Sequence, residues 1–317
     1  MVAPELEFYL VDVNKNPDIP LQPPVGRSGR AEVGHQAYSI EAVNEFDPLF
    51  EDIYDYCEAQ NLEVDTLIHE VGAAQMEINF LHGDPLDLAD RVFLFKRTVR
   101  EVALRHNMYA TFMAKPMENE PGSAMHIHQS IVDAETGENI FSDADGKESK
   151  LFYHYIAGLQ AYVPALMPIF APFVNSYRRL SRFTAAPINI QWGYDNRTVG
   201  LRVPMSGPAN RRVENRIAGV DSNPYLAIAA TLAAGYLGMV QQLEPTEPIS
   251  TDAYNMPYEL PRNLESAIAL MRGSEDIASV LGQTFVDAYT SVKETEYEAF
   301  FFRVISSWER RHLLLYV

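Results

Sequence analysis

The chain begins with a stretch in which polar and apolar side chains alternate. Within residues 4–13, Glu5 and Glu7 are two positions apart, and so are Leu6 and Phe8. Side chains two apart in a strand point to the same side of a sheet. The pattern therefore predicts a strand with one buried face. It also predicts that the two glutamates project together from the opposite face.

Other stretches follow the period of a helix or a strand. Leu88, Val92 and Phe95 recur every three or four residues, which is typical of an amphipathic helix. We predict helices over residues 45–60, 85–107 and 147–170 and over most of the chain after 223. We predict strands over residues 63–69, 75–81, 109–113, 125–132, 188–192, 199–203 and 212–217. Pro164 and Pro168 are expected to break or kink the third helix. A Pro- and Gly-rich segment, residues 14–36, is predicted to be a long loop.

The order of these elements indicates the fold class. Strands and helices are mixed without the regular alternation of βαβ units, and neither a repeat nor an evident linker divides the chain. This order favours an α+β fold with a largely antiparallel sheet. We expect residues 1–317 to form one domain.

Composition and charge narrow the function. Asp and Glu number 43 against 25 Lys and Arg, a net charge of −18 that argues against nucleic acid or anionic membrane as a partner. The single cysteine, Cys57, cannot form an internal disulfide and is expected to be structural. Acids stand where a signal peptide needs basic residues, so we expect a cytoplasmic protein. The uncharged run 222–243 is rich in Ala and Gly, and we expect a buried helix there.

Acids and histidines gather on several predicted strands. The candidates are Glu5 and Glu7, then Glu70 and Glu77 around a turn, then His126, His128 and Ser130, and finally Arg212, Glu214 and Arg216. Each pattern alone is common on exposed strands, but together they indicate one shared cleft. Converging carboxylates cannot all stay charged without cations. Oxygen-rich donors suit Mg²⁺ or Mn²⁺ better than Zn²⁺.

Arginines accompany these acids and indicate phosphate chemistry. They are Arg178, Arg179, Arg197, Arg202, Arg211, Arg212 and Arg216. The sequence contains neither a GxxxxGK[ST] loop nor a GxGxxG loop. A nucleotide would therefore be held by metal ions and arginines.

Eight segments, in order along the chain, resemble the glutamine synthetase family. They are PELEFYL, HEVGAAQMEI, FMAKP, GSAMHIHQS, NSYRRL, WGYDNRTVGLRVP, RRVENR and NPYLAIAATLAAGYLG. The resemblance implies a sheet that forms a partial barrel surrounded by helices. It also implies ATP and Mg²⁺ (or Mn²⁺) as cofactors, L-glutamate and a small amine as substrates, and a homo-oligomer, either a dodecamer or a decamer.

The resemblance also assigns roles to single residues. For one metal ion, the implied ligands are Glu7, Glu70 and Glu77. For the other ion, they are Glu5, His126 and Glu214. For glutamate, the implied binding residues are Arg179, Arg216 and the backbone of Gly122. For the transferring phosphate, they are Arg197 and Arg202. For ATP, they are His128, Ser130 and Arg212, with Asp65 on the ribose side. The implied reaction forms γ-glutamyl phosphate, whose carbonyl an amine then attacks.

Two departures from the family pattern concern the amine. Glutamine synthetases proper carry a glutamate in the loop after NSY(K/R)RL, whereas this chain has Ala185 within SRFTAAP. Pro121 and Ala124 also differ from the usual histidine motif. These features are similar to the γ-glutamylpolyamine and γ-glutamylmethylamide synthetase branch, which implies an alkylamine or a polyamine such as putrescine as substrate. Ammonia is the alternative substrate.

A third departure concerns the beginning of the chain. The family carries an N-terminal β-grasp domain before PELEFYL, and in this chain only three residues precede that motif. In the family, a neighbouring subunit's copy of this domain covers the active site. We therefore expect weaker rings, and a catalytically impaired scaffold is the non-enzymatic alternative.

Overall fold

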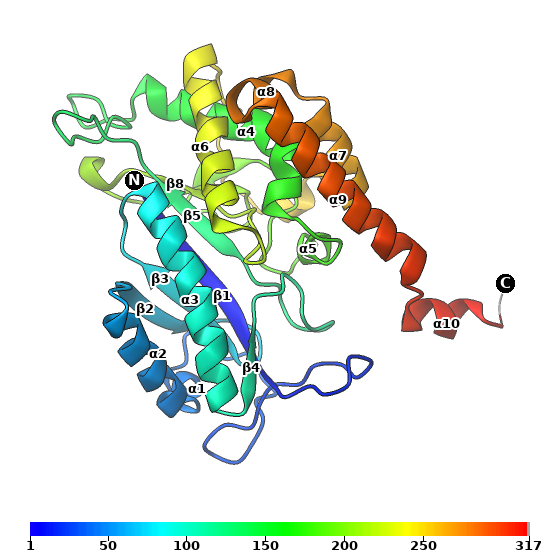
Figure 1. Cartoon of the computed structure of the whole chain (residues 1–317). Coiled ribbons are helices and arrows are strands. Elements are labelled where there is room, and N and C mark those ends of the chain that lie inside the picture. Colours follow the sequence, from blue (N-terminus) through cyan, green and yellow to red (C-terminus); the bar gives the residue numbers. More distant parts are fainter. Residues whose placement is uncertain (316–317) are drawn as a thin grey trace.

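The computed structural model describes residues 1–315 and contains one eight-stranded sheet (Figure 1). The strands are β1 (Val2–Asp12), β2 (Val64–His69), β3 (Gln75–Phe80), β4 (Met108–Thr111), β5 (Met125–Gln129), β6 (Trp192–Tyr194), β7 (Leu201–Val203) and β8 (Val213–Asn215). Their order is β2-β3-β1-β5-β8-β7-β6, and β4 pairs with the end of β1. All pairs are antiparallel except β6 with β7, so the predicted α+β fold with a largely antiparallel sheet is confirmed.

The register of the central strands brings the acidic residues together. Glu7 of β1 lies opposite Glu77 of β3, and Glu5 lies opposite His126 of β5. One strand further, His128 lies opposite Glu214 of β8. Directly paired residues have Cβ atoms about 5 Å apart. The polar face of the sheet therefore concentrates carboxylates and imidazoles at its centre.

Ten helices accompany this sheet within residues 1–315. They are α1 (Ile40–Asn44), α2 (Asp47–Ala59), α3 (Pro85–Arg105), α4 (Lys150–Phe170), α5 (Ser176–Arg179), α6 (Pro224–Gln241), α7 (Leu264–Arg272), α8 (Glu275–Leu281), α9 (Gln283–Arg303) and α10 (Ser307–Leu313), with 3-10 turns η1 (Pro208–Asn210) and η2 (Ala253–Asn255). The apolar side of β1 packs on α3, where the rings of Phe8 and Phe95 meet edge to face at 6.5 Å. Cys57 is buried on α2, and burial raises the pKa of its thiol to about 11, which fits a structural role.

Helices α4 and α6 lie against each other (Figure 1), and they pack closely because glycines face each other where they meet. A Cβ added at Gly158 would lie 2.7 Å from the Cα of Gly238, and one added at Gly238 would lie 2.1 Å from the carbonyl oxygen of His154. No larger residue fits this crossing without moving backbone. Among residues 1–315, α6 is the one helix with the length and apolarity of a membrane span. Its packing on α4 and α3 bears out the predicted buried helix.

Two predictions about local structure need comment. Helix α4 is continuous through Pro164 and Pro168, so a break does not occur there and a kink stays a prediction; packing against α6 and α7 outweighs the loss of amide donors. The strand predicted over 188–192 begins only at Trp192. The side chain of Asn189 donates to the carbonyl of Ala253, and that of Gln191 donates to Glu259, so these residues belong to a buried loop network.

Candidate active site

A cavity of about 480 Å³ lies over the polar face of the central strands. Six of its lining residues are the predicted metal ligands Glu5, Glu7, Glu70, Glu77, His126 and Glu214. They come from β1, the β2–β3 turn, β3, β5 and β8. The alternation of each strand supplies the side chains, and the antiparallel register aligns them.

Glu5 lies at the centre of this cluster. Its two carboxylate oxygens lie 3.1 Å from His126 Nδ1 and 2.8 Å from His128 Nε2. Ligand atoms of Glu5, Glu77 and His126 fall within 4.8 Å of one another, and so do those of Glu5, His128 and Glu214. The geometry thus adds His128, expected to contact ATP, to the residues that could hold an ion.

Burial and mutual repulsion make several of these carboxyls hard to ionise. Burial, aided by the charge of Glu70, raises the pKa of Glu7 to about 8. Burial, aided by Glu5 and Glu7, raises the pKa of Glu77 to about 9. Burial also raises the pKa of Glu70. A cation would relieve this repulsion by replacing the protons.

The other two carboxyls have cationic or hydrogen-bonding neighbours that oppose the effect of burial. Burial alone would raise the pKa of Glu5, but hydrogen bonds with His126 and His128 outweigh it and hold that pKa well below its usual range. Burial would also raise the pKa of Glu214, but the charges of Arg216 and His126 outweigh this effect and lower that pKa to about 2. Carboxyls with a lowered pKa therefore lie next to carboxyls with a raised pKa in this cluster.

Arginines line the same cavity beside the acids. Arg202 donates to Glu214 and to Asp195 at 2.7 Å each, and Arg216 donates to Glu214 at 2.6 Å. Among residues 1–315, the Nε atoms of Arg202 and Arg216 are buried without a hydrogen-bond partner. Arg179 is buried, and one of its terminal nitrogens donates to the carbonyls of three consecutive residues, 216–218. These guanidiniums can offer charge to an anion in the cavity.

Two further predicted residues, Gly122 and Ala185, line the cavity at positions where the backbone is constrained. A Cβ at Gly122 would lie 2.3 Å from Arg179 Cγ and 2.6 Å from the carbonyl oxygen of Ala114, so only glycine fits beside that arginine. Ala185 lines the cavity with φ +61°, and Phe183 two residues earlier also has φ +61°. Left-handed conformations at residues other than glycine are uncommon and concentrate at functional sites.

Four predicted residues lie outside the cavity lining, and one of them is His128, which contacts Glu5 beside the cavity. Arg212 flanks the cluster, with its Nε 3.3 Å from His128 Nδ1. Ser130 follows the end of β5, where its backbone pairs with Met1. Asp65 is exposed on β2, an edge strand away from the cluster. Their suggested contacts with ATP stay predictions.

Sequence reasoning missed several residues of the cavity wall. Gln75 and Asn79 lie on β3 two positions either side of Glu77, so extending the alternation would have found them. Arg197, which sequence reasoning did include, donates to the hydroxyl of Tyr38 at 3.2 Å. Tyr38 reaches the cavity from a loop and Tyr254 from the short 3-10 turn η2, and neither segment has a periodic sequence signal.

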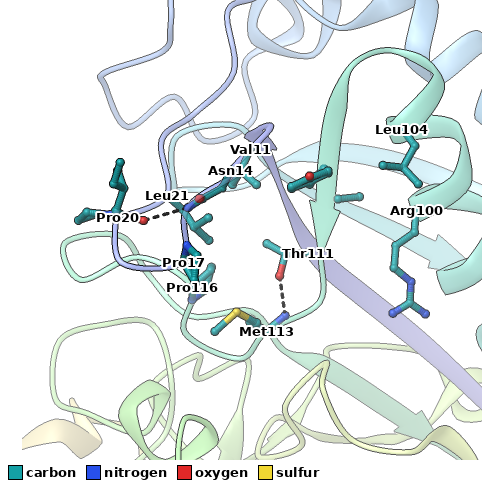
Figure 2. A pocket seen from close by; sticks show the side chains of 13 residues that line it. Val11, Asn14, Pro17, Pro20, Leu21, Arg100, Leu104, Thr111, Met113 and Pro116 are labelled. Atoms are coloured by element: carbon teal, nitrogen blue, oxygen red, sulfur yellow. Dashed lines mark hydrogen bonds between the residues drawn. The ribbon is translucent and has the colours of Figure 1, made fainter. Parts of the chain in front are cut away.

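A separate pocket of about 680 Å³ differs sharply in chemistry (Figure 2). It lies between the loop after β1, the end of α3 and the segment after β4. Its lining is mainly apolar, including Val11, Leu21, Leu104 and Met113, and Arg100 is its one charged residue. The acid and arginine cluster, and with it the candidate chemistry, lies in the other cavity.

Comparisons with known proteins agree with this geometry. The family description "Glutamine synthetase, catalytic domain" matches residues 1–313. The chain is 38% identical over 302 residues to gamma-glutamylputrescine synthetase PuuA of Escherichia coli (strain K12), covering 93% of this chain and 63% of that protein. It is 36% identical to a glutamate–isopropylamine ligase of Pseudomonas sp, covering 86% of this chain and 59% of that protein.

Glutamine synthetases and a solved structure are also similar to this chain. A glutamine synthetase of Pyrococcus abyssi is 34% identical, covering 98% of this chain and 69% of that protein. The structure described as apo GmaS without ligand superposes with a TM-score of 0.84 at 31% identity, covering 99% of this chain and 72% of that chain. The chain spans less than two thirds of the length of the first two relatives. On the motifs, the fold and these matches, the chain belongs to the glutamine synthetase family.

Proposed function

We propose that this protein is an ATP-dependent ligase that joins a primary alkylamine or a polyamine, such as putrescine, to the γ-carboxylate of L-glutamate. One observation carries the choice of amine. The cavity wall at residues 183–186 consists of Phe183, Thr184, Ala185 and Ala186, and it bears no carboxylate. An alkyl chain gains from such a wall, whereas ammonium gains from an anionic one.

The residues of the cluster fit a divalent cation such as Mg²⁺ or Mn²⁺. Glu7, Glu70 and Glu77 would hold one ion, and Glu5, His126 and Glu214 another, with His128 beside them. Oxygen-rich donor sets are those that these hard cations prefer. Bound there, the cations would neutralise charge on the phosphates of ATP.

The protein's own residues would then orient and stabilise the reactants. Arg179 and Arg216 would bind glutamate, and Arg197 and Arg202 would face the transferring phosphate. The γ-carboxylate oxygen attacks the γ-phosphorus of ATP, which forms γ-glutamyl phosphate and releases ADP. A neutral amine then attacks the carbonyl carbon, phosphate leaves, and the new amide nitrogen loses a proton.

The apolar wall would receive the alkyl part of the amine. The rings of Phe183 and Tyr254 lie 5.4 Å apart at this wall, and the side chain of Phe183 is exposed. Each methylene buried there contributes about 0.8 kcal/mol. The chain should accordingly discriminate in favour of longer amines.

Ammonia is the second candidate, because the glutamine synthetase relative is nearly as similar as the amine ligases. A coupled phosphate-release assay with ammonia, methylamine, isopropylamine and putrescine separates the two. Higher kcat/KM for putrescine or isopropylamine supports the proposal, and higher kcat/KM for ammonia overturns it. We also propose that the protein is cytoplasmic, which cell fractionation tests, and that it forms a homo-oligomer, which light scattering of the purified protein tests.

A further inference from the structure

The turn between β2 and β3 carries Glu70 and leads to Glu77. Its amides are bound one after another by side-chain oxygens. Gly72 N donates to the side chain of Gln75 at 3.0 Å, and Ala73 N donates to the carboxylate of Glu120 at 3.0 Å. Ala74 N donates to the carboxylate of Glu32 at 2.9 Å. Side chains from three parts of the chain thus fix one short turn.

This turn needs external support because its backbone is strained. Ala74 is fully buried and has φ +56°, a conformation that residues with a Cβ rarely adopt. A turn of this kind relaxes unless the surrounding structure holds it. Any relaxation would rotate the segment that sets Glu70 relative to Glu77.

Glu32 holds this segment from both ends. Its side chain is 8% exposed although it belongs to an irregular loop. Besides Ala74 N, its carboxylate lies 3.0 Å from Nε2 of His69. His69 Nδ1 lies 2.7 Å from the carbonyl oxygen of Glu70, which can only accept, so this nitrogen carries a proton. Nε2 donates to the Glu32 carboxylate, which can also only accept, and these two hydrogen bonds hold the ring against the Glu70 peptide.

The same loop also reaches the arginine side of the cavity. The amide of Tyr38 donates to the carbonyl of His69 at 2.8 Å, and the hydroxyl of Tyr38 accepts from Arg197 at 3.2 Å. Tyr38 itself has φ +64°. Glu32 therefore anchors a loop that touches both the acid cluster and an arginine expected to face phosphate.

We propose that Glu32 is a positioning residue that holds the Glu70 side of the cluster in the geometry needed to bind a divalent cation. The inference rests on the proposed function in one respect, namely that the cluster binds such a cation. Partners that orient metal ligands typically change affinity or activity about 10–100-fold when mutated. Glu32 acts through His69 and Ala74 and touches no reacting atom.

The test measures Mn²⁺ binding by electron paramagnetic resonance, without ATP or glutamate, alongside thermal unfolding. We expect Glu32→Ala to weaken Mn²⁺ binding at least about ten-fold. Glu32→Gln should stay within about three-fold of wild type, because its amide oxygen can take the place of the one carboxylate oxygen, Oε2, that accepts from Ala74 N and lies next to His69 Nε2. Glu51→Ala, at an exposed carboxylate on α2, is the matched control and should bind like wild type.

Glu32→Asp covers the case in which the alanine variant does not fold. Its carboxylate is one methylene short of His69 and Ala74, so binding should weaken about three-fold or more. Wild-type Mn²⁺ affinity in folded Glu32→Ala or Glu32→Asp would overturn the inference and leave the proposed function standing. Absence of Mn²⁺ binding in the wild-type protein would instead overturn the proposed metal function and this inference with it.

Discussion

Replacing Ala185 with glutamate should shift the amine preference of the enzyme from putrescine toward ammonia. Ala185 lines the cavity in an uncharged wall with Phe183 and Thr184. A glutamate there would offer ammonium an anionic partner and would fill space available to an alkyl chain. Ala185→Glu should therefore raise kcat/KM for ammonia and lower it for putrescine.

The size of the change follows from the apolar contact that would be lost. Putrescine has about four methylenes at about 0.8 kcal/mol each, so full burial contributes about 3 kcal/mol. The putrescine-to-ammonia ratio of kcat/KM should then fall on the order of 100-fold. Partial burial gives proportionally less, and about ten-fold corresponds to two buried methylenes.

The assay is phosphate release at saturating ATP and glutamate with each amine varied. Ala185→Gln is the matched control, because it adds nearly the same volume without charge. It should lower the putrescine rate without improving the ammonia rate. An unchanged ratio in Ala185→Glu refutes the reasoning, because Ala185 would then not contact the amine.

Two other predictions concern metal binding and packing. The pKa values of Glu7 and Glu77, raised to about 8 and 9 from 4.5, mean that the metal-free folded protein holds protons that the unfolded chain has released. The melting temperature of the protein in EDTA should therefore fall as pH rises from about 5 to 9, whereas its Mn²⁺ affinity should rise over about pH 7–9. A melting temperature that rises, or an Mn²⁺ affinity that falls, over these ranges would contradict the raised pKa values of Glu7 and Glu77. Gly238→Ala places a Cβ 2.5 Å from Gly158 Cα and should lower the free energy of unfolding, measured by urea denaturation, by about 1–3 kcal/mol. Gly273→Ala is the control, because the nearest neighbour of its Cβ is at 3.4 Å, and equal effects of the two substitutions would contradict the close helix crossing.

The polar face of the sheet was predictable because strand periodicity is local. Alternation placed Glu5 and Glu7 on one side of β1, and the structure keeps them there. Which residues face each other depends on register, which long-range pairing determines. The family resemblance grouped Glu7 with Glu77 and Glu5 with His126 around shared ions, but the register that places each pair on neighbouring strands came only from the fold.

The loops that complete the cavity were not predictable in the same way. Glu32 and Tyr38 belong to a segment without periodicity, and their positions depend on hydrogen bonds to His69. Likewise, of the break or kink expected at Pro164 and Pro168, a break did not occur, because tertiary packing holds α4 together. Local pattern therefore identified the acids, and long-range contacts determined what surrounds them.

Product identification in direct competition tests the central claim most directly. The purified protein would receive ATP, Mg²⁺ and L-glutamate with equal concentrations of ammonia and putrescine, and mass spectrometry would measure the products over time. The account predicts that γ-glutamylputrescine forms faster than glutamine, and that Glu5→Gln, which disrupts the cation cluster, abolishes both. Glutamine as the main product would contradict the proposed amine, and undiminished synthesis by Glu5→Gln would contradict the proposed site.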